Sequence, residues 1–278
     1  MKIAFQGEHG AYSEAAVLDY FTKGVEPVPC ESFEKVFEGV ESGTNDYGLI
    51  PIENSLAGSI HQNYDLILKH ALSIVGERYL RVRHCLIANP GVKLSEIRQV
   101  ISHPQALAQS NQYLKSLGKV VEIKAVYDTA GAVKLVRDQK ERSIAAVASQ
   151  RAAEFYGMEI LAEGIEDHLD NFTRFLLIGV QPVFPEKEAK TSIVFTLQNK
   201  PGALFRSLSV LALRDLDLTK IESRPDVGKL WEYLFYVDFI GSTSDPVVKR
   251  AMENLEEYTL MLRILGSYPR HKITEALQ

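Results

Sequence analysis

Short apolar runs alternate with segments of helical periodicity over the first 180 residues, and this alternation limits the possible folds more than any other feature of the sequence. The apolar runs predict strands at Lys2–Gln6, Tyr47–Ile52, Leu72–Val75, His84–Ala88, Gln99–Ser102, Val120–Tyr127, Ser143–Ala148 and Phe172–Val180. Apolar spacings of three and four residues predict helices at Tyr12–Phe21, Phe33–Glu41, Ser59–His70, Gln105–Leu117, Thr129–Gln139 and Gln150–Tyr156. Strands that alternate with helices are typical of α/β proteins.

The order of elements changes after Gln181–Lys190, a segment with two prolines and clustered charge that we interpret as a linker. It separates a first region, residues 1–181, from a module at 190–268. In that module the sequence predicts strands at Thr191–Leu197, Leu218–Ser223, Leu230–Ile240 and Thr259–Ser267, with helices at Gly202–Leu213 and Pro246–Glu257. This is the βαββαβ order of a ferredoxin-like fold.

The composition excludes several classes of function. A net charge of -5 argues against nucleic-acid binding, which normally shows as a basic excess. Cys30 and Cys85 lie far apart, so they form neither a disulfide framework nor a zinc motif. The first residues are too briefly apolar for a secretory signal, and no stretch is long enough to cross a membrane. We therefore expect a cytoplasmic protein without a membrane partner.

Four polar segments lie at predicted strand ends or strand–helix junctions, where α/β proteins bind ligands. They are Gln6–Ser13, Pro51–Ser59, Ser102–Gln105 with Gln109, and Asn171–Phe175. Each also has a purely structural interpretation: a turn, a helix cap at Ser55 or Ser59, a solvated helix start, and the beginning of a buried strand. None shows a dinucleotide-binding glycine pattern, a metal-ligand spacing or a serine-hydrolase elbow.

Taken together and in order, four motifs resemble the prephenate dehydratase family. They are Gly10-Ala11-Tyr12-Ser13, Pro51-Ile52-Glu53-Asn54-Ser55, His103-Pro104-Gln105 and Thr173-Arg174-Phe175. The module after the linker resembles an ACT domain through Gly202-Ala203-Leu204-Phe205 and Glu222-Ser223-Arg224-Pro225. The resemblance covers about residues 1–268 and begins without a chorismate mutase segment, so a monofunctional form is expected.

The resemblance implies a two-subdomain α/β catalytic region like a periplasmic binding protein, with the active site between the subdomains. Residues 1–79 with 162–181 are expected to form one subdomain, and residues 80–161 the other. The implied reaction converts prephenate to phenylpyruvate with loss of CO2 and water, and it requires neither a cofactor nor a metal.

The resemblance also implies the site residues. Thr173 is the essential residue, and we expect it to act by orientation and hydrogen bonding, because a threonine hydroxyl does not titrate near neutral pH. Glu53 is an alternative acid. Arg174 either pairs with a substrate carboxylate or forms a structural salt bridge. The candidate substrate contacts are Asn54, Ser55, Ser102, Gln105, Gln109 and Phe175, the last as part of the wall.

The ACT-like module implies feedback inhibition by L-phenylalanine, bound between paired copies in a homodimer or a dimer of dimers. The helix that follows Asn199-Lys200-Pro201-Gly202 presents an N-terminus suited to a carboxylate. The expected effector contacts are Asn199, Pro201, Gly202, Ala203, Leu204, Phe205, Glu222 and Ser223. Three alternatives stay open: an arogenate dehydratase, a non-catalytic amino-acid sensor, and a module that only dimerises the enzyme.

Overall fold

The computed structural model describes residues 1–226 and 232–272. The chain divides into two compact units. The first comprises Met1–Leu66 and Arg78–Phe175, and the second comprises Ile67–Glu77 and the described residues that follow Phe175. Two strands, β5 (Ser73–Arg81) and β11 (Phe172–Gly179), run from one unit into the other along the chain.

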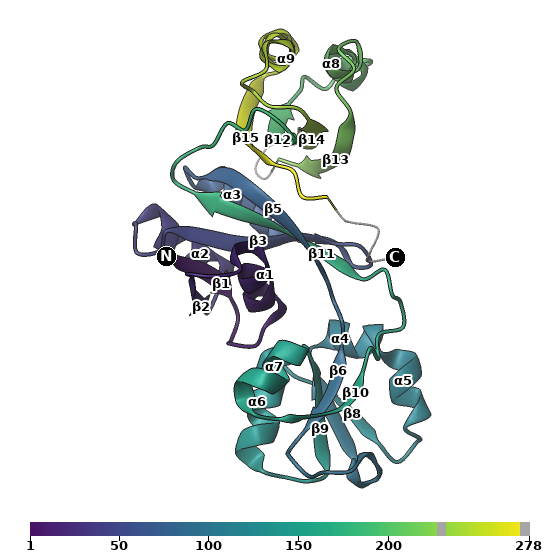
Figure 1. Ribbon diagram of the computed structural model, residues 1–278. Helices are drawn as coiled ribbons and strands as arrows, with labels where there is room; N and C mark the ends of the chain where they lie inside the picture. Colours follow the sequence, from purple (N-terminus) through teal and green to yellow (C-terminus); the bar gives the residue numbers. More distant parts are fainter. Residues whose placement is uncertain (227–231, 273–278) are drawn as a thin grey trace. The chain divides into compact units, whose positions relative to one another are not determined.

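The first lobe of the first unit is built on a six-stranded sheet (Figure 1). Its strands run in the order β2-β1-β3-β11-β5, and β4 pairs with β3. The elements are β1 (Lys2–Gln6), α1 (Tyr12–Phe21), β2 (Glu26–Cys30), α2 (Phe33–Glu41), β3 (Tyr47–Asn54), β4 (Gly58–Ser59) and α3 (His61–Lys69). Ile3, Ala4 and Phe5 of β1 are fully buried, which places this strand in the core.

The second lobe of the same unit has a five-stranded sheet in the order β10-β6-β9-β7-β8. Its elements are β6 (Cys85–Ala88), the short 3-10 helix η1 (Leu94–Glu96), β7 (Gln99–Ser102), α4 (Pro104–Gln109), α5 (Asn111–Ser116), β8 (Glu122–Ala125), α6 (Thr129–Gln139), β9 (Ile144–Ala148), α7 (Gln150–Tyr156) and β10 (Glu159–Glu163). Every residue of β9 is buried, because this strand lies at the centre of the sheet.

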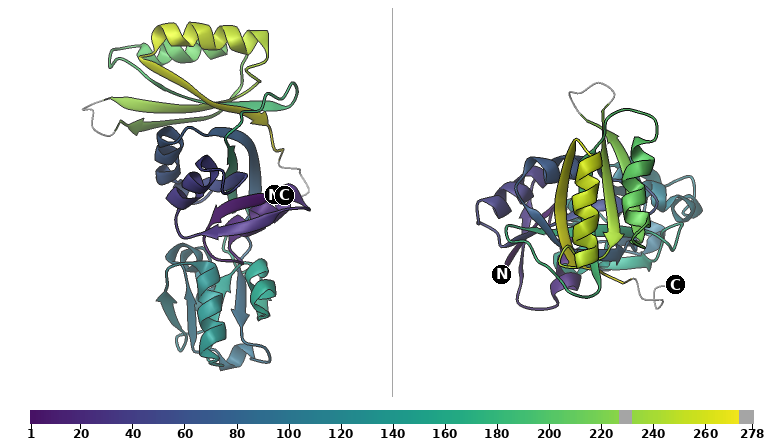
Figure 2. Two further views of the ribbon diagram at one scale, coloured as in Figure 1. Left: turned by 90° about the vertical axis from the view of Figure 1, so that its left-hand side faces the viewer. Right: turned by 90° about the horizontal axis from the view of Figure 1, so that it is seen from above.

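The second unit contains an antiparallel sheet in the order β13-β14-β12-β15, with both helices on one face (Figure 2). Its elements are β12 (Ala189–Thr196), α8 (Ala203–Ala212), β13 (Leu218–Pro225), β14 (Tyr233–Ile240), α9 (Pro246–Tyr258) and β15 (Met261–Pro269). The predicted βαββαβ order and α/β fold class are confirmed. Residues 230 and 231 of the predicted third strand lie outside the described residues.

Three strands were not predicted, β2, β4 and β10, and β2 shows why. Its sequence Glu-Pro-Val-Pro-Cys contains Pro27 and Pro29, which cannot donate a backbone hydrogen bond. The strand is nevertheless formed, in parallel register with β1, because it lies at the edge of the sheet. An edge strand needs partners on one side only, so two prolines are tolerated. Of the other two, β10 is also an edge strand, and β4 has only two residues.

The predicted helix Gln105–Leu117 is wrong as a single element, because it breaks at Ser110 into α4 and α5. The break is stabilised from a distant part of the chain. The Asp167 backbone N–H donates to the Gln109 carbonyl at 2.6 Å, and the Asp167 carboxylate accepts from the Gln112 N–H at 3.0 Å. Backbone groups that leave the helical ladder therefore find partners elsewhere.

The predicted linker Gln181–Lys190 is too long at its end, since Ala189 and Lys190 belong to β12. Lys190 is 3% exposed and its ammonium lies 2.8 Å from the Glu77 carboxylate. Glu77 also accepts the His271 backbone N–H at 3.1 Å. From the sequence, Lys190 is expected to be exposed, because charged residues cluster beside it. In the structure it is buried and pairs with the Glu77 carboxylate of β5.

Candidate active site

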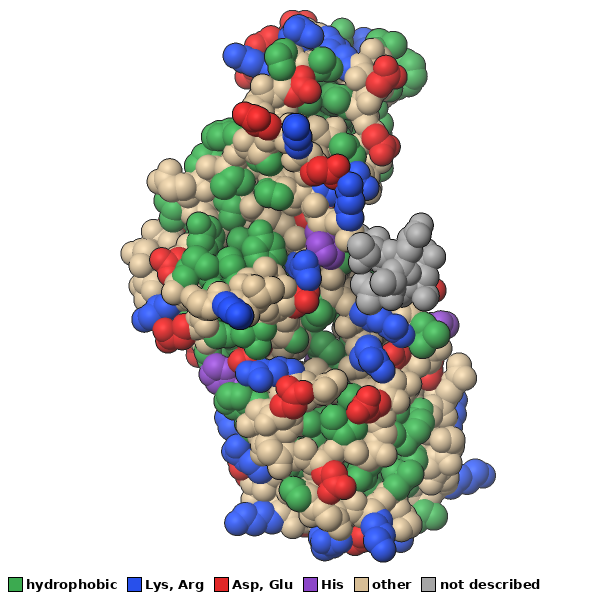
Figure 3. Space-filling model, viewed as in Figure 1, with side chains coloured by type: hydrophobic (Ala, Val, Ile, Leu, Met, Phe, Trp, Pro, Cys, Tyr) green, Lys and Arg blue, Asp and Glu red, His purple; other side chains and the backbone are tan. Residues whose placement is uncertain are grey.

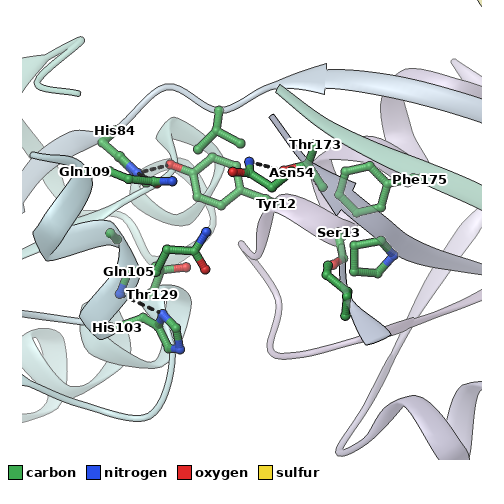
Figure 4. Close-up of a pocket in the computed structure, with 14 residues that line it drawn as sticks. Tyr12, Ser13, Asn54, His84, His103, Gln105, Gln109, Thr129, Thr173 and Phe175 are labelled. Atoms are coloured by element: carbon green, nitrogen blue, oxygen red, sulfur yellow. Dashed lines mark hydrogen bonds between the residues drawn. The ribbon is translucent and has the colours of Figure 1, made fainter. Parts of the chain in front are cut away.

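A cavity of about 190 Å³ lies in the first unit, and both lobes contribute to its wall (Figure 4). Its lining residues are Tyr12, Ser13, Pro51, Asn54, Ile60, Val82, His84, His103, Gln105, Ala106, Gln109, Thr129, Thr173 and Phe175. These residues include no Lys, Arg, Asp or Glu. The wall therefore combines apolar side chains with neutral hydrogen-bonding groups, as is usual for small-molecule sites.

The polar centre of the cavity is formed by Asn54 at the end of β3 and Thr173 in β11. Both side chains are almost fully buried, at 7% and 9% exposed. The Asn54 amide nitrogen donates to the Thr173 hydroxyl at 3.1 Å. Its oxygen accepts the backbone N–H groups of Leu56 and Ala57 at 3.1 and 2.9 Å, which fixes the orientation of the amide. Thr173 therefore receives a hydrogen bond and keeps its own proton to donate.

Ser55 holds the chain at this place but does not line the cavity. Its hydroxyl donates to the Asp170 carbonyl at 2.6 Å and accepts the Phe172 N–H at 2.9 Å. Its own N–H donates to the Phe172 carbonyl at 2.8 Å. Ser55 therefore connects the end of β3 to the start of β11, which carries Thr173, and its hydroxyl does not cap a helix.

Glu53 and Arg174 form an ion pair with an N–O distance of 3.2 Å, and neither lines the cavity. Neighbouring residues on a strand point to opposite faces of the sheet. Asn54 and Thr173 face the cavity, so Glu53 and Arg174 face away from it. The Arg174 guanidinium also lies 5.9 Å from the ring centre of Tyr79. The structure thus places these two predicted residues in the salt bridge that the sequence left open as an alternative.

The second lobe contributes glutamine side chains from α4. Gln105 and Gln109 both line the cavity, as their four-residue spacing predicts. Figure 4 shows Gln109 beside His84, with an Nε2–Oε1 distance of 3.0 Å. The other ring nitrogen of His84 lies 2.7 Å from the Tyr12 hydroxyl. Burial lowers the pKa of His84 and raises the pKa of Tyr12 well above its ordinary value, so both groups are neutral near pH 7.

Ser102 does not reach the cavity. It is fully buried at the end of β7, and its hydroxyl donates to the Val147 carbonyl at 2.5 Å. Phe175 is 1% exposed and forms part of the apolar wall, as expected. Of the nine predicted catalytic and substrate-contacting residues, five line the cavity: Asn54, Gln105, Gln109, Thr173 and Phe175.

The sequence reasoning missed several lining residues, above all His84 and Thr129. His84 is the first residue of the predicted strand His84–Ala88 and belongs to no motif, so nothing marked it. Thr129 is the first residue of α6, directly after the N-cap Asp128, and the sequence marked it only as the start of a helix. Tyr12 and Ser13 begin α1 and belong to the quoted glycine motif, yet were not assigned a role. First turns of two helices, α1 and α6, therefore meet at the cavity, and helix N-termini favour bound anions.

The glycine motif also joins the two lobes. Gly10 has φ +90°, and a Cβ built on it would lie 2.7 Å from the Ala152 Cα in α7. Ser149 donates to the Gly10 carbonyl at 2.6 Å, and the buried Glu14 carboxylate accepts the Gly10 N–H at 2.7 Å. Glu14 lies 3.4 Å from Arg151. A glycine is required here because the backbones approach each other closely.

The residues predicted to contact an effector lie in the second unit, on two elements. Gly202, with φ +77°, precedes α8, and Ala203 lines a cavity of about 130 Å³ with Lys200, Arg206 and Tyr258. Asn199, Pro201 and Phe205 are exposed, while Leu204 is half-buried. Glu222 and Ser223 lie in the edge strand β13, and Glu222 pairs with Lys220 at 3.2 Å.

The described residues show no group of three or more His, Cys, Asp or Glu placed to hold a metal ion. No helix among residues 1–226 and 232–272 has the length and apolar character needed to span a bilayer. On the face drawn in Figure 3, acidic and basic side chains are interspersed. A field of one sign, which nucleic-acid binding normally requires, is not seen on that face.

Comparison with known proteins identifies the family. Residues 3–183 match the family described as prephenate dehydratase, and residues 191–257 match the ACT domain. An Arabidopsis thaliana protein named arogenate dehydratase/prephenate dehydratase 2, chloroplastic, is 51% identical over 280 residues, covering 97% of this chain and 73% of the relative. Related Arabidopsis proteins are 45% and 46% identical.

Solved structures are similar to nearly the whole chain. Prephenate dehydratase from Arthrobacter aurescens, in complex with L-Phe, is 31% identical, with a TM-score of 0.88 and coverage of 97% of this chain and 90% of that one. A protein described as GqqA, a quorum quenching acylase, is 35% identical, with a TM-score of 0.90 and coverage of 98% of each chain.

The comparison overturns one expectation. A cytoplasmic location is wrong by this measure, because the Arabidopsis relatives are named as chloroplastic. The argument from the first residues tested only for a secretory signal, whereas organelle import depends on other sequence properties.

The match over residues 3–183 and the 51% identity across nearly the whole chain establish that this protein is a dehydratase of the prephenate dehydratase family, a lyase whose catalytic region is followed by an ACT domain.

Proposed function

We propose that the protein converts prephenate to phenylpyruvate, with loss of CO2 and of the ring hydroxyl as water. The observation that carries this proposal is the Asn54–Thr173 hydrogen bond inside a cavity lined by no Lys, Arg, Asp or Glu. Because the Asn54 amide donates to the oxygen of the Thr173 hydroxyl, the proton of this hydroxyl is directed toward a bound ligand. The ring oxygen that leaves as water needs a hydrogen-bond donor beside it, and the Thr173 hydroxyl is such a donor.

Thr173 acts in this proposal by hydrogen bonding and not as a free acid. Efficient general acids titrate near the working pH, and an aliphatic hydroxyl does not. A donor fixed before the reaction stabilises the charge that develops on the leaving oxygen. Aromatisation of the ring drives the loss of CO2. The substrate carboxylates are held by neutral donors from Gln105 and Thr129 and by the helix N-termini of α1 and α6.

Arogenate is a second candidate substrate, and it differs by an ammonium group in place of the side-chain keto group. The relative at 51% identity carries both substrates in its name, which supports this alternative as well as prephenate. The lining residues given above do not include a carboxylate to pair with an ammonium. The proposal therefore ranks prephenate first.

The second unit has a regulatory role in this proposal. Residues 1–181 form the catalytic region, with subdomains of 1–79 plus 162–181 and 80–161, and residues 190–268 form an ACT domain that binds L-phenylalanine. The L-Phe complex of the relative supports this ligand. Phe205 is 76% exposed and β13 is an edge strand, features that suit pairing with a second copy as a homodimer or a dimer of dimers.

Phenylpyruvate formation by the purified protein tests the proposal, with prephenate and arogenate compared by kcat/KM in the presence and absence of L-phenylalanine. We expect turnover of prephenate that L-phenylalanine suppresses. Turnover that ignores L-phenylalanine removes the regulatory part. If neither substrate reacts, the proposed function fails, and the acylase activity named for the 35% identical relative becomes the next assay.

A further inference from the structure

Three side chains form a continuous hydrogen-bonded chain along the cavity wall. Tyr12 is the first residue of α1, His84 lies just before β6, and Gln109 ends α4. The Tyr12 hydroxyl is 2.7 Å from His84 Nδ1, and His84 Nε2 is 3.0 Å from Gln109 Oε1. The Tyr12 hydroxyl is also 2.7 Å from the Arg83 carbonyl. All three side chains line the cavity (Figure 4).

The number of protons in this chain limits its arrangement. A phenol has one proton, a neutral imidazole has one, and an amide has two on nitrogen and none on oxygen. His84 is 2% exposed, and burial keeps its ring neutral by lowering its pKa. One ring nitrogen must therefore donate while the other accepts.

In the first arrangement the Tyr12 hydroxyl donates to His84 Nδ1. The proton of His84 is then on Nε2 and is donated to the Gln109 oxygen. The Gln109 NH2 group consequently faces the cavity as a donor.

In the second arrangement the Tyr12 hydroxyl donates to the Arg83 carbonyl and accepts a proton from His84 Nδ1. His84 Nε2 then accepts, so the Gln109 amide turns and donates its NH2 group to the ring. The Gln109 oxygen now faces the cavity as an acceptor. The two arrangements differ in proton positions, in the amide orientation and at the Arg83 carbonyl, which accepts the single Tyr12 proton only in the second.

We propose that Tyr12 and His84 are positioning residues that set the amide of Gln109 as donor or acceptor, and that this choice adapts the cavity to a keto or an ammonium side chain. The inference rests on the proposed function, because it concerns the substrates named there. A keto oxygen only accepts, so prephenate requires the first arrangement. An ammonium group only donates, so arogenate requires the second.

The tautomer of His84 is the direct readout of this chain. Enzyme labelled with ¹⁵N in its histidines and carrying Thr173→Val, which is expected to bind without turnover, is studied with saturating prephenate and then with arogenate. Side-chain ¹⁵N shifts distinguish a protonated Nε2 from a protonated Nδ1, and the His84→Gln variant assigns the signal. We expect protonated Nε2 with prephenate and protonated Nδ1 with arogenate. The same tautomer with both ligands, or an imidazolium with either, overturns the inference.

Kinetics give a second test. Gln109→Glu presents only acceptor oxygens, so the ratio of kcat/KM for arogenate to that for prephenate should rise at least tenfold. Gln105→Glu is the matched control, because it adds the same charge to the same wall from the same helix. Equal changes in the ratio for both variants indicate a charge effect alone and refute the inference.

The two proposals fail separately. A wild-type enzyme that converts neither substrate refutes the proposed function. A wild-type enzyme that converts at least one of them, with a His84 tautomer that does not respond to the ligand, refutes only this inference.

Discussion

The Asn54 amide nitrogen lies 3.1 Å from the Thr173 hydroxyl, across two strands that are 119 residues apart in the chain. The Asn54 oxygen is occupied by two backbone N–H groups, so the amide cannot turn without losing both hydrogen bonds. Thr173 is thereby held as a donor. The chemistry of the cavity depends on this pair more than on any single side chain.

Removing the hydroxyl of Thr173 should remove most of the activity. We expect Thr173→Val to lower kcat by about 100-fold or more, in the range found for the loss of one fixed donor. Thr173→Ser keeps the hydroxyl and should retain most of kcat. The check is steady-state kinetics on both variants with prephenate. A Val variant with normal kcat would show that Thr173 has no part in the reaction.

Replacing Asn54 should cost stability as well as activity. Asn54→Ala leaves the buried Asn171 amide oxygen without its donor and the partly exposed Leu56 and Ala57 N–H groups without their acceptor, and we expect a loss of about 1–3 kcal/mol in the free energy of unfolding. Asn54→Asp retains an acceptor oxygen and should lose less stability, while its kcat still falls because the donor to Thr173 is gone. Urea denaturation and kcat are measured on both. Equal stability losses would contradict the role of the Asn54 oxygen.

Gly10→Ala should destabilise the first unit more than the same substitution at Gly118 does. Gly10 and Gly118 have φ +90° and φ +93°, so an alanine at either position suffers a similar backbone strain of about 1 kcal/mol. At Gly118 an added Cβ has no atom within 4 Å, whereas at Gly10 it meets the Ala152 backbone. Overpacking adds about 1–3 kcal/mol. Thermal denaturation of both variants compares the costs, and equal values would refute the close approach.

The buried pair of Lys190 and Glu77 should show strong coupling. Lys190→Met leaves the Glu77 carboxylate buried without its ammonium partner, which we expect to cost about 3–5 kcal/mol. The double variant Lys190→Met with Glu77→Leu removes both charges and should be more stable than Lys190→Met alone. A double-mutant cycle by denaturation measures this coupling. Additive effects would mean that the two side chains do not depend on each other.

Cys85 should be unreactive in the folded protein. Burial raises the pKa of its thiol to about 11, so at pH 8 roughly one molecule in a thousand carries the reactive thiolate. In the Cys30→Ser variant, we expect reaction with a disulfide reagent to be slow until the protein is unfolded. The reaction should accelerate as the pH rises toward 11, because the thiolate form then increases. Rapid reaction at pH 8 without unfolding contradicts the burial of this thiol.

Much of the secondary structure was predictable because local signals carry it. Helices α1, α2 and α7 begin and end at the residues predicted from their apolar spacing, and the caps Ser32 of α2 and Gly157 of α7 are local features as well. Ser110 was not predictable, because the helix breaks there through partners at Asp167. The strand β2 was missed because its prolines are acceptable only at an edge, and the position of a strand in a sheet is not a local property.

The residues of the candidate site also divide into those that local motifs predicted and those that depend on distant parts of the chain. The motifs predicted Thr173, Asn54 and Gln105 as cavity residues, since each motif begins or ends an element, and the four-residue spacing from Gln105 added Gln109. His84 was missed, because its significance depends on Tyr12 and Gln109, which are 72 and 25 residues away in the chain. Arg174 and Glu53 belong to the same motifs, yet strand alternation turns both away from the cavity.

The sequence by itself determined the fold class, the order of elements and the family, because periodicity, caps and motif order are written along the chain. Only the tertiary structure decided which side chains of those motifs share a cavity, where a helix breaks and which charges are buried as pairs. The physical reason is that hydrogen-bond partners and burial depend on residues distant in sequence. A polar residue has the same local pattern whether it caps a turn, pairs with a buried charge or faces a substrate.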